Sequence, residues 1–236
     1  MGFEPIVPGV FGMGLPKGYV NAFLIVSEDG AALVDTGLPK RSARISAAMR
    51  EVGVAPGSLK HLLVTHHHVD HTGSLAALVT ETGASVYVHP LDAPIVRGQA
   101  PAPPANRKGL GMVLGPVLER FGPKPPPARI DHALADGETL DIAGGLEVVF
   151  TPGHTAGHCS FLLPSRRVLF AGDAAGALMG RVGLPLGMFT EDMARAKESV
   201  RKLAGMDFDT ACLGHGSVVK GDALAGFRKL VDKLAA

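Results

Sequence analysis

The stretch Thr65-His66-His67-His68-Val69-Asp70-His71-Thr72-Gly73 places four potential metal ligands, His66, His68, Asp70 and His71, within one turn of the chain. A short apolar run precedes it and predicts a strand. In an extended loop after that strand, His66 and His68 occupy alternate positions and project to the same side. Asp70 and His71 fall where the loop bends into a predicted helix, so they point toward a second, adjacent position.

Imidazole and carboxylate groups at this spacing are typical metal ligands. Neutral imidazole binds zinc, iron, nickel or copper, and a carboxylate widens that choice. A lone surface histidine is usually solvated, and a histidine tract also binds metals weakly and adventitiously. A strand, a loop with four ligand candidates and then a helix instead indicate a built site for one ion or two.

Composition limits the classes of partner. The 236 residues, 46% of them hydrophobic and 19% charged, fit one large globular domain, predicted to span residues 1–236. A formal net charge of +1 provides no field that would steer a polyanion, so nucleic acid is not expected as a partner.

Cysteine content and the N-terminus predict a cytoplasmic protein. Cys159 and Cys212 each lie in an apolar, strand-like run, where a buried structural thiol is expected. Residues 1–8 contain two prolines and no basic region, so they make a poor signal peptide. No apolar run approaches the roughly 20 residues of a membrane span, so no membrane partner is expected.

Periodicity predicts alternating strands and helices. Strands are predicted at residues 19–27, 31–34, 62–64, 84–88, 139–142, 146–150, 159–163, 167–170 and 210–213. Helices are predicted at residues 40–52, 74–81, 110–120, 191–204 and 222–234. This order predicts helices packed on sheets. A proline-rich insertion at about 98–129 carries excess basic residues, and it either covers the active site, forms a solvated face or makes a homodimer contact.

Further ligand candidates follow other predicted strands. His154 lies in the loop Thr151–His158, TPGHTAGH, whose glycines and proline present one side chain rigidly. Asp173 ends Ala-Gly-Asp, and His215 is bracketed by two glycines. Asp35 also ends a strand, where it either serves the site or caps the next helix.

These candidates sort into two groups of ligands. One ion would take three imidazoles from His66, His68 and His154. Another would take Asp70, His71 and His215, and Asp173 is the candidate bridge between them.

The chain resembles the metallo-β-lactamase-fold hydrolases from Asn21 to Gly216. His66, His68, Asp70 and His71 match the HxHxDH loop of that family. His154 matches its later ligand histidine, Asp173 its bridging aspartate and His215 its final histidine. Asp35 matches the aspartate of its early Asp-Thr-Gly turn. The resemblance implies an α/β fold, a four-layer αββα sandwich, with two metal ions in a groove at one edge of the sheets. Zinc is the first candidate, and iron and manganese are the alternatives.

Within that superfamily, the TPGHTAGH loop is most similar to glyoxalase II and its thioester-hydrolysing relatives. Glyoxalase II holds glutathione with a helical C-terminal domain, whereas little more than one helix follows His215 here. Lactonases of the fold share the same ligands. Persulfide dioxygenases are also similar but use a single iron, and a non-catalytic metal-binding protein is the remaining alternative. Nucleases of the fold also carry the loop, and the near-neutral charge argues against them.

The resulting hypothesis is a dinuclear hydrolase of a small-molecule ester, thioester or lactone. Two ions about 3.5 to 4 Å apart would share a water and lower its pKa, and the hydroxide is the predicted nucleophile. Asp70 would both ligate and orient it, Asp173 would hold both ions, and Asp35 would accept an N–H from a ligand histidine. The apolar side chains of residues 176–189 predict an apolar acyl or ring-bearing substrate, or else cover the core or a dimer contact.

The other histidines are predicted to bind no metal. His67 and His158 are expected to support the site structurally. His61 and His132 are expected to be exposed, and His89 to be a surface or capping residue.

Overall fold

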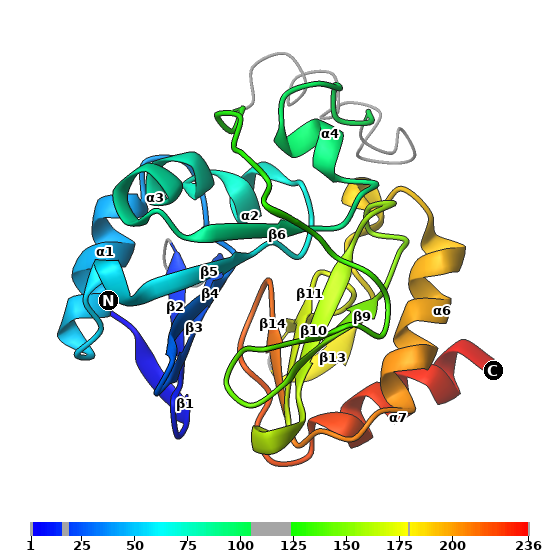
Figure 1. The fold of residues 1–236 in the computed structure, drawn as a ribbon. Helices are drawn as coiled ribbons and strands as arrows, with labels where there is room; N and C mark the ends of the chain where they lie inside the picture. The colour runs from blue at the N-terminus through cyan, green and yellow to red at the C-terminus, as the bar shows by residue number, and fades with distance from the viewer. Residues whose placement is uncertain (1, 16–18, 105–123, 179, 236) are drawn as a thin grey trace.

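Two β-sheets lie face to face with helices on their outer sides (Figure 1). The computed structural model describes residues 2–15, 19–104, 124–178 and 180–235. The layers run helix, sheet, sheet, helix, so the predicted αββα sandwich is confirmed.

The first sheet is built from the N-terminal half of the chain. Its seven strands, in spatial order, are β1 Glu4–Val7, β2 Val10–Leu15, β3 Val20–Ser27, β4 Gly30–Val34, β5 Leu59–Leu63, β6 Ser85–Val88 and β7 His132–Ala133. The strands β1 to β4 pair antiparallel, and β4 to β7 pair parallel. The parallel strands send their carboxyl ends to the same edge of the sheet.

The second sheet has five strands. In spatial order they are β14 Thr210–Leu213, β11 Val168–Gly172, β10 Cys159–Leu163, β9 Leu146–Phe150 and β8 Thr139–Leu140. Within this sheet, only the β11–β14 pair is parallel. A separate hairpin, β12 Gly176–Leu178 with β13 Arg181–Gly183, follows β11.

Two helices cover the outer face of each sheet. On the first sheet these are α1 Ser42–Glu51 and α3 Leu75–Thr82, and on the second α6 Met193–Ala204 and α7 Ala223–Ala235. Asp192 sets the start of α6, because its side chain accepts the backbone N–H groups of Ala194 and Arg195. Two short helices, α2 Val69–Thr72 and α4 Ala93–Val96, follow β5 and β6.

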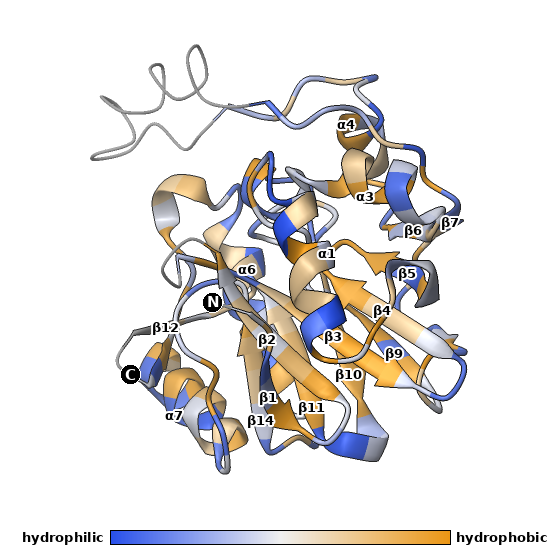
Figure 2. Cartoon of the chain, turned by 90° about the vertical axis from the view of Figure 1, so that its left-hand side faces the viewer, coloured by the Kyte–Doolittle hydropathy of each residue, from blue (hydrophilic) through white to orange (hydrophobic). Residues whose placement is uncertain are grey.

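Apolar side chains fill each interface between layers, and the strands are correspondingly hydrophobic in Figure 2. In the central interface, Phe23 of β3 meets Phe170 of β11 with ring centroids 5.8 Å apart. Cys159 and Cys212 are both completely buried there, as predicted. Burial raises the pKa of both thiols, which makes them unreactive.

Some predictions lie outside the described residues. The predicted helix at 110–120 and the centre of the insertion at 98–129 belong to that part of the chain. Among the described residues, no helix is both long enough and apolar enough to cross a membrane.

Strand ends place the ligand candidates at one edge of the sandwich. Asp35 follows β4, the histidine loop follows β5, the His154 loop follows β9, Asp173 follows β11, and His215 follows β14. Gly214 is needed at this edge, because a Cβ there would lie 2.0 Å from Asp173 Oδ1. Both sheets therefore contribute to a single site.

Candidate metal centre

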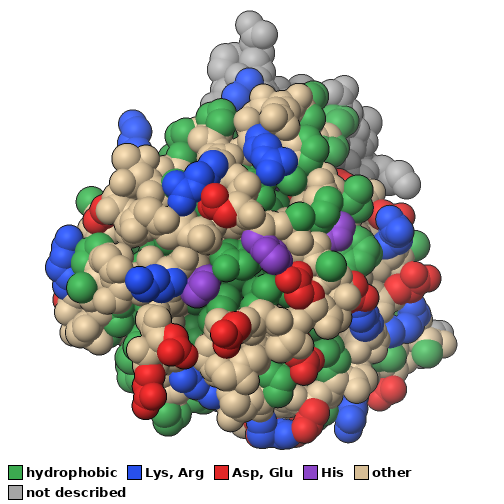
Figure 3. Space-filling view, in the orientation of Figure 1, with side chains coloured by type: hydrophobic (Ala, Val, Ile, Leu, Met, Phe, Trp, Pro, Cys, Tyr) green, Lys and Arg blue, Asp and Glu red, His purple; other side chains and the backbone are tan. Residues whose placement is uncertain are grey.

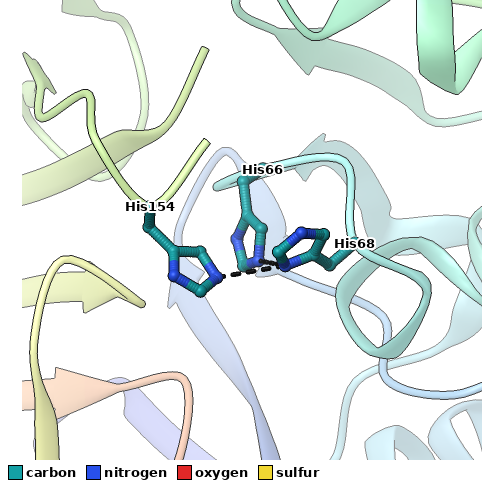
Figure 4. A group of neighbouring side chains, drawn as sticks. All are labelled: His66, His68 and His154. Carbon is teal, nitrogen blue, oxygen red and sulfur yellow. Dashed lines mark hydrogen bonds between the residues drawn. The ribbon is translucent and has the colours of Figure 1, made fainter. Parts of the chain in front are cut away.

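Three imidazoles from two loops meet at one point (Figure 4). His68 Nδ1 lies 3.0 Å from His66 Nε2 and 3.0 Å from His154 Nε2. His66 and His68 come from the loop after β5, as predicted from their alternate positions, and His154 comes from the loop after β9. The structure thus brings together the three histidines that the sequence assigned to one ion.

The spacing of these nitrogens fits a tetrahedral ion. Zinc binds imidazole at about 2.0–2.1 Å, which places two nitrogens of a tetrahedral site roughly 3.3 Å apart. His68 Nδ1 can share a proton with only one of its two neighbours. A cation at the centre would satisfy all three lone pairs together.

Outer partners fix which nitrogen of His66 and His154 carries a proton. The Thr65 hydroxyl donates to Asp35 Oδ2, so at 3.0 Å it accepts the Nδ1–H of His66. The Thr190 hydroxyl donates to a backbone carbonyl, so at 3.3 Å it accepts the Nδ1–H of His154. These tautomers, assigned from the hydrogen-bond network, leave both Nε2 lone pairs facing the ion position.

A second group combines Asp70, His71 and His215. His215 Nε2 lies 3.3 Å from Asp70 Oδ2, and His71 Nε2 lies 4.0 Å from the same oxygen. His215 Nδ1 donates to the carbonyl of Tyr19, so its Nε2 is the nitrogen that faces the group. This matches the predicted second set, although Asp70 and His71 already lie within helix α2 and do not precede it.

Asp173 lies between the two groups. Its Oδ2 is 3.4 Å from His154 Nε2 and 3.2 Å from His215 Nε2, and its Oδ1 is 3.6 Å from His71 Nε2. Both Asp173 Oδ1 and His71 Nε2 are buried without a hydrogen-bond partner. Buried polar atoms seldom stay unpaired, so these two atoms indicate where a cation belongs.

Asp35 supports the histidine loop and does not cap a helix. Its Oδ1 accepts the backbone N–H of Thr65 at 2.9 Å, and its Oδ2 accepts the Thr65 hydroxyl and His71 Nδ1–H, each at 2.8 Å. Helix α1 begins only at Ser42, so the capping alternative is wrong. Asp35 has a φ of 59°, a left-handed conformation that aspartate tolerates better than most residues.

The charges of the two groups differ. Burial lowers the pKa of His66 and His154 well below the usual value, and neighbouring histidines lower it further. Burial also lowers the pKa of His71, but Asp173, Asp35 and Asp70 outweigh it and raise the pKa to about 9.

The pKa of His215 is raised to about 11, because hydrogen bonds to Asp173 and Asp70 outweigh its burial. Burial alone would raise the pKa of Asp173, but His71 and the other adjacent histidines hold it well below the usual range. Without metal, the second group therefore carries protons where a cation would otherwise sit.

Among the described residues, the ligand candidates differ in how exposed they are. The side chains of His215 and Asp70 are 31% and 19% exposed, and His68 is partly exposed. His66, His71 and His154 are buried. A small molecule would therefore approach along the edge formed by His68, Asp70 and His215.

His67 and His158 lie outside the ligand groups found among the described residues. His158 Nε2 accepts the backbone N–H of Asp173 at 2.9 Å, and its Nδ1 lies 2.8 Å from the Thr151 hydroxyl. Burial, the main cause, lowers the pKa of His158 to about 4, so the ring is neutral at physiological pH. The ring thus holds the backbone at Asp173 in place.

The prediction of exposure for His61 and His132 is met only in part, because each side chain has a bonding partner. His61 and His132 are partly buried and bonded: His61 Nδ1 lies 2.9 Å from the Tyr87 hydroxyl, and His132 Nε2 lies 2.6 Å from Glu138 Oε1. His89 is partly exposed, and its Nδ1 accepts the N–H of Leu91 at 3.3 Å, as a capping histidine would.

Asp92 is a buried residue of this region that the sequence did not single out. Its side chain bonds the His67 backbone and the loop at 155–157. In the sequence it looks like an ordinary helix cap before Ala93-Pro94, but its side chain makes no capping bond.

Comparison with known proteins identifies the family. The model of the metallo-beta-lactamase superfamily matches residues 15–215. The chain is 30% identical to the Bacillus subtilis (strain 168) protein named "Probable metallo-hydrolase YflN", with 99% of this chain and 92% of that protein covered. It is 31% identical to the hydroxyacylglutathione hydrolase of Acidiphilium cryptum (strain JF-5), covering 82% of this chain and 63% of that enzyme.

A solved structure of a family member has the same fold as this chain. A metallo-beta-lactamase family protein from Thermus thermophilus superposes with a TM-score of 0.72 at 26% identity, covering 98% of this chain and 81% of that one. The chain belongs to the metallo-beta-lactamase superfamily. It is a metal-dependent hydrolase, and the predicted similarity to the glyoxalase II branch is confirmed.

Proposed function

We propose that this enzyme is a dinuclear hydrolase that cleaves an ester, thioester or lactone bond of a small molecule. The observation that supports this proposal is the position of Asp173, whose carboxylate oxygens face both ligand groups. Its buried Oδ1 has no hydrogen-bond partner. His66, His68 and His154 would hold one ion, and Asp70, His71 and His215 the other, with Asp173 touching both. Two bound divalent ions supply an acidified water and a polarised carbonyl, with zinc preferred over iron or manganese.

The chain's own residues orient the reacting groups. Asp70 is partly exposed at the centre. There its carboxylate can accept a hydrogen bond from a water molecule and orient the water oxygen toward the substrate carbonyl. Asp35 and Thr65 hold the tautomers of His71 and His66, which keeps their inward nitrogens unprotonated when metal is bound. The backbone at Asp173 is held by His158.

One exposed aromatic side chain flanks the centre, and the backbone of a second exposed apolar residue is tied to it; both support a substrate with an apolar part. The Tyr19 ring is 59% exposed and meets the His215 ring edge-on, with centroids 5.4 Å apart. Leu186 is 71% exposed, and its carbonyl holds the Thr190 hydroxyl that faces His154. Exposed apolar groups beside a polar centre are typical of a small-molecule site.

The segment at 176–189 contributes less to a pocket than predicted. It forms the β12–β13 hairpin and a short turn at Gly187–Phe189, and Leu184 packs against the core between the second sheet and its helices. The side chains of residues 178 and 179 lie outside the described part of the chain. Leu186 is therefore the residue of this segment that we assign to substrate contact.

Surface charge supports a small molecule over a polyanion. On the face drawn in Figure 3, acidic and basic side chains are interspersed. With a net charge of +1, such a surface has no field for nucleic acid. We further propose that residues 1–236 form one domain, because both sheets contribute ligands. The cytoplasmic location and the homodimer stay predictions.

Hydrolysis of a panel of thioesters, lactones and aryl esters by the zinc-loaded enzyme tests this proposal. We expect turnover of at least one class and loss of turnover after chelation. His215→Ala removes a ligand of the second group and is expected to abolish the same activity. Oxygen uptake with a persulfide substrate, with no hydrolysis and no effect of His215→Ala, would instead establish a mononuclear iron oxygenase.

A further inference from the structure

A buried carboxylate joins the two loops that supply the three-imidazole group. Asp92 is 1% exposed, and its Oδ2 accepts the backbone N–H of His67 at 2.8 Å and the Thr155 hydroxyl at 2.9 Å. Its Oδ1 accepts the backbone N–H of Gly157 at 2.8 Å. His67 lies between the candidate ligands His66 and His68, and Thr155 directly follows the candidate ligand His154.

Among the described residues, no other carboxylate makes hydrogen bonds to both loops. Asp35 bonds Thr65 and His71, which belong to the loop after β5 alone. Glu191 accepts the N–H of Ala156, in the loop after β9 alone. Since the two loops come from different sheets, Asp92 links the sheets at the height of the ligands.

The local sequence is adapted to this contact. A Cβ at residue 157 would lie 2.5 Å from Asp92 Oδ1, so glycine permits the approach of the loop. His67 Nδ1 also lies 3.1 Å from Asp92 Oδ2, so the His67 ring faces the same carboxylate as its backbone N–H. Asp92 precedes helix α4 but its side chain does not cap that helix, so its oxygens are left to accept hydrogen bonds from the two loops.

We propose that Asp92 is a positioning residue that sets the distance of His154 from His66 and His68, and so the metal affinity of the three-imidazole group. Its effect is confined to that group, because Asp70, His71 and His215 receive no bond from it. The inference rests on the proposed dinuclear centre. Asp92→Asn keeps the shape of the side chain but replaces one accepting oxygen with a donor that faces N–H or O–H donors.

Two backgrounds separate the two groups. His215→Ala leaves the three-imidazole group intact, and His154→Ala leaves the other group intact. Zinc affinity is measured in each by competition with a chelator, with and without Asp92→Asn. Outer-sphere partners of metal ligands typically contribute 10- to 100-fold in affinity. We expect a loss of about that size in the His215→Ala background and less than about a 2-fold change in the His154→Ala background.

Two further variants guard against a trivial loss of folding. Thr155→Val removes one hydrogen bond to Asp92 and is expected to cause a smaller loss, again only in the His215→Ala background. Asp131→Asn, an exposed aspartate that accepts the N–H of Val86, is the matched control and should leave both affinities unchanged. Circular dichroism of the metal-free proteins checks that each variant is folded.

The outcomes are distinct. Equal losses in both backgrounds would show a general structural role and overturn the inference, and so would no loss in either. If wild-type protein binds no zinc, the proposed dinuclear function fails and the inference falls with it. If wild type binds two ions and Asp92→Asn has no selective effect, only the inference fails.

Discussion

Asp35→Asn is the sharpest test of how the fold prepares the ligand histidines. Asp35 is 3% exposed and accepts three hydrogen bonds, from the Thr65 backbone N–H, the Thr65 hydroxyl and His71 Nδ1. Asparagine keeps the size of the side chain and tolerates the φ of 59°. The substitution therefore isolates the loss of charge and of one accepting oxygen.

The size of the effect follows from those bonds. Whichever way the amide turns, at least one donor faces the new NH2 group and loses its acceptor. A hydrogen bond to a charged group contributes about 1.5–3 kcal/mol. A loss of this size in metal binding corresponds to roughly 10- to 100-fold in affinity, which is also the range for outer-sphere partners of metal ligands.

Competition between the protein and a chelator for zinc measures that affinity. Thermal unfolding of the metal-free protein measures how much the substitution lowers the stability of the fold. We expect the variant to fold, to unfold at a lower temperature and to bind zinc at least about 10-fold more weakly. Asp131→Asn serves again as the exposed control and should match wild type. Wild-type zinc affinity in a folded Asp35→Asn protein would refute the role of Asp35 in fixing His71 and, through Thr65, His66.

Three other expectations follow from the same geometry. Asp173→Ala removes the carboxylate between the two groups and should lower the metal content and abolish turnover. Near-normal hydrolysis by a correctly folded variant would contradict the assignment of Asp173. His67→Ala keeps the backbone N–H that Asp92 accepts and should retain both ions by elemental analysis, whereas loss of one ion would make His67 a ligand. Metal binding at pH 7.5 should release protons, because the pKa values of His71 and His215 are raised to about 9 and about 11 in the metal-free chain. Calorimetry in buffers of different ionisation enthalpy counts the protons, and zinc affinity should rise with pH from about 6 to 9; pH-independent affinity with no proton release would contradict the raised values.

The ligand groups could be predicted from the sequence because each ligand follows a strand. The order of apolar runs and glycine-bracketed histidines indicates which side chains reach one edge of a sheet, and the structure brings His66, His68 and His154 together there. The alternation of helical and strand periods along the chain predicted helices packed on sheets. The four-layer αββα arrangement was implied by the resemblance to the metallo-β-lactamase fold.

The N-terminal hairpin was not predicted. Pro5 in β1 and the two glycines of β2, Gly12 and Gly14, weaken the local strand signal. The strand β2 forms because it pairs with β3 along its whole length, from Val10 opposite Ile25 to Leu15 opposite Val20. Tertiary pairing therefore outweighs local propensity here.

Asp92 and the paired histidines were missed because their partners are distant in the chain. Gly157 lies 65 residues from Asp92, and Tyr87 lies 26 residues from His61. The local sequence around Asp92 gives no sign of these partners, and the local sequence around His61 predicts exposure. Only the approach of separate loops gives these residues their contacts.

A hydrolytic centre in which Asp173 would hold two ions makes a direct prediction about metal content. Elemental analysis of the protein purified without added metal, followed by a zinc titration of turnover, tests it most directly. We predict two ions per chain, with activity lost on chelation and restored only as the second equivalent of zinc is bound. One ion per chain with full hydrolytic activity would contradict the account.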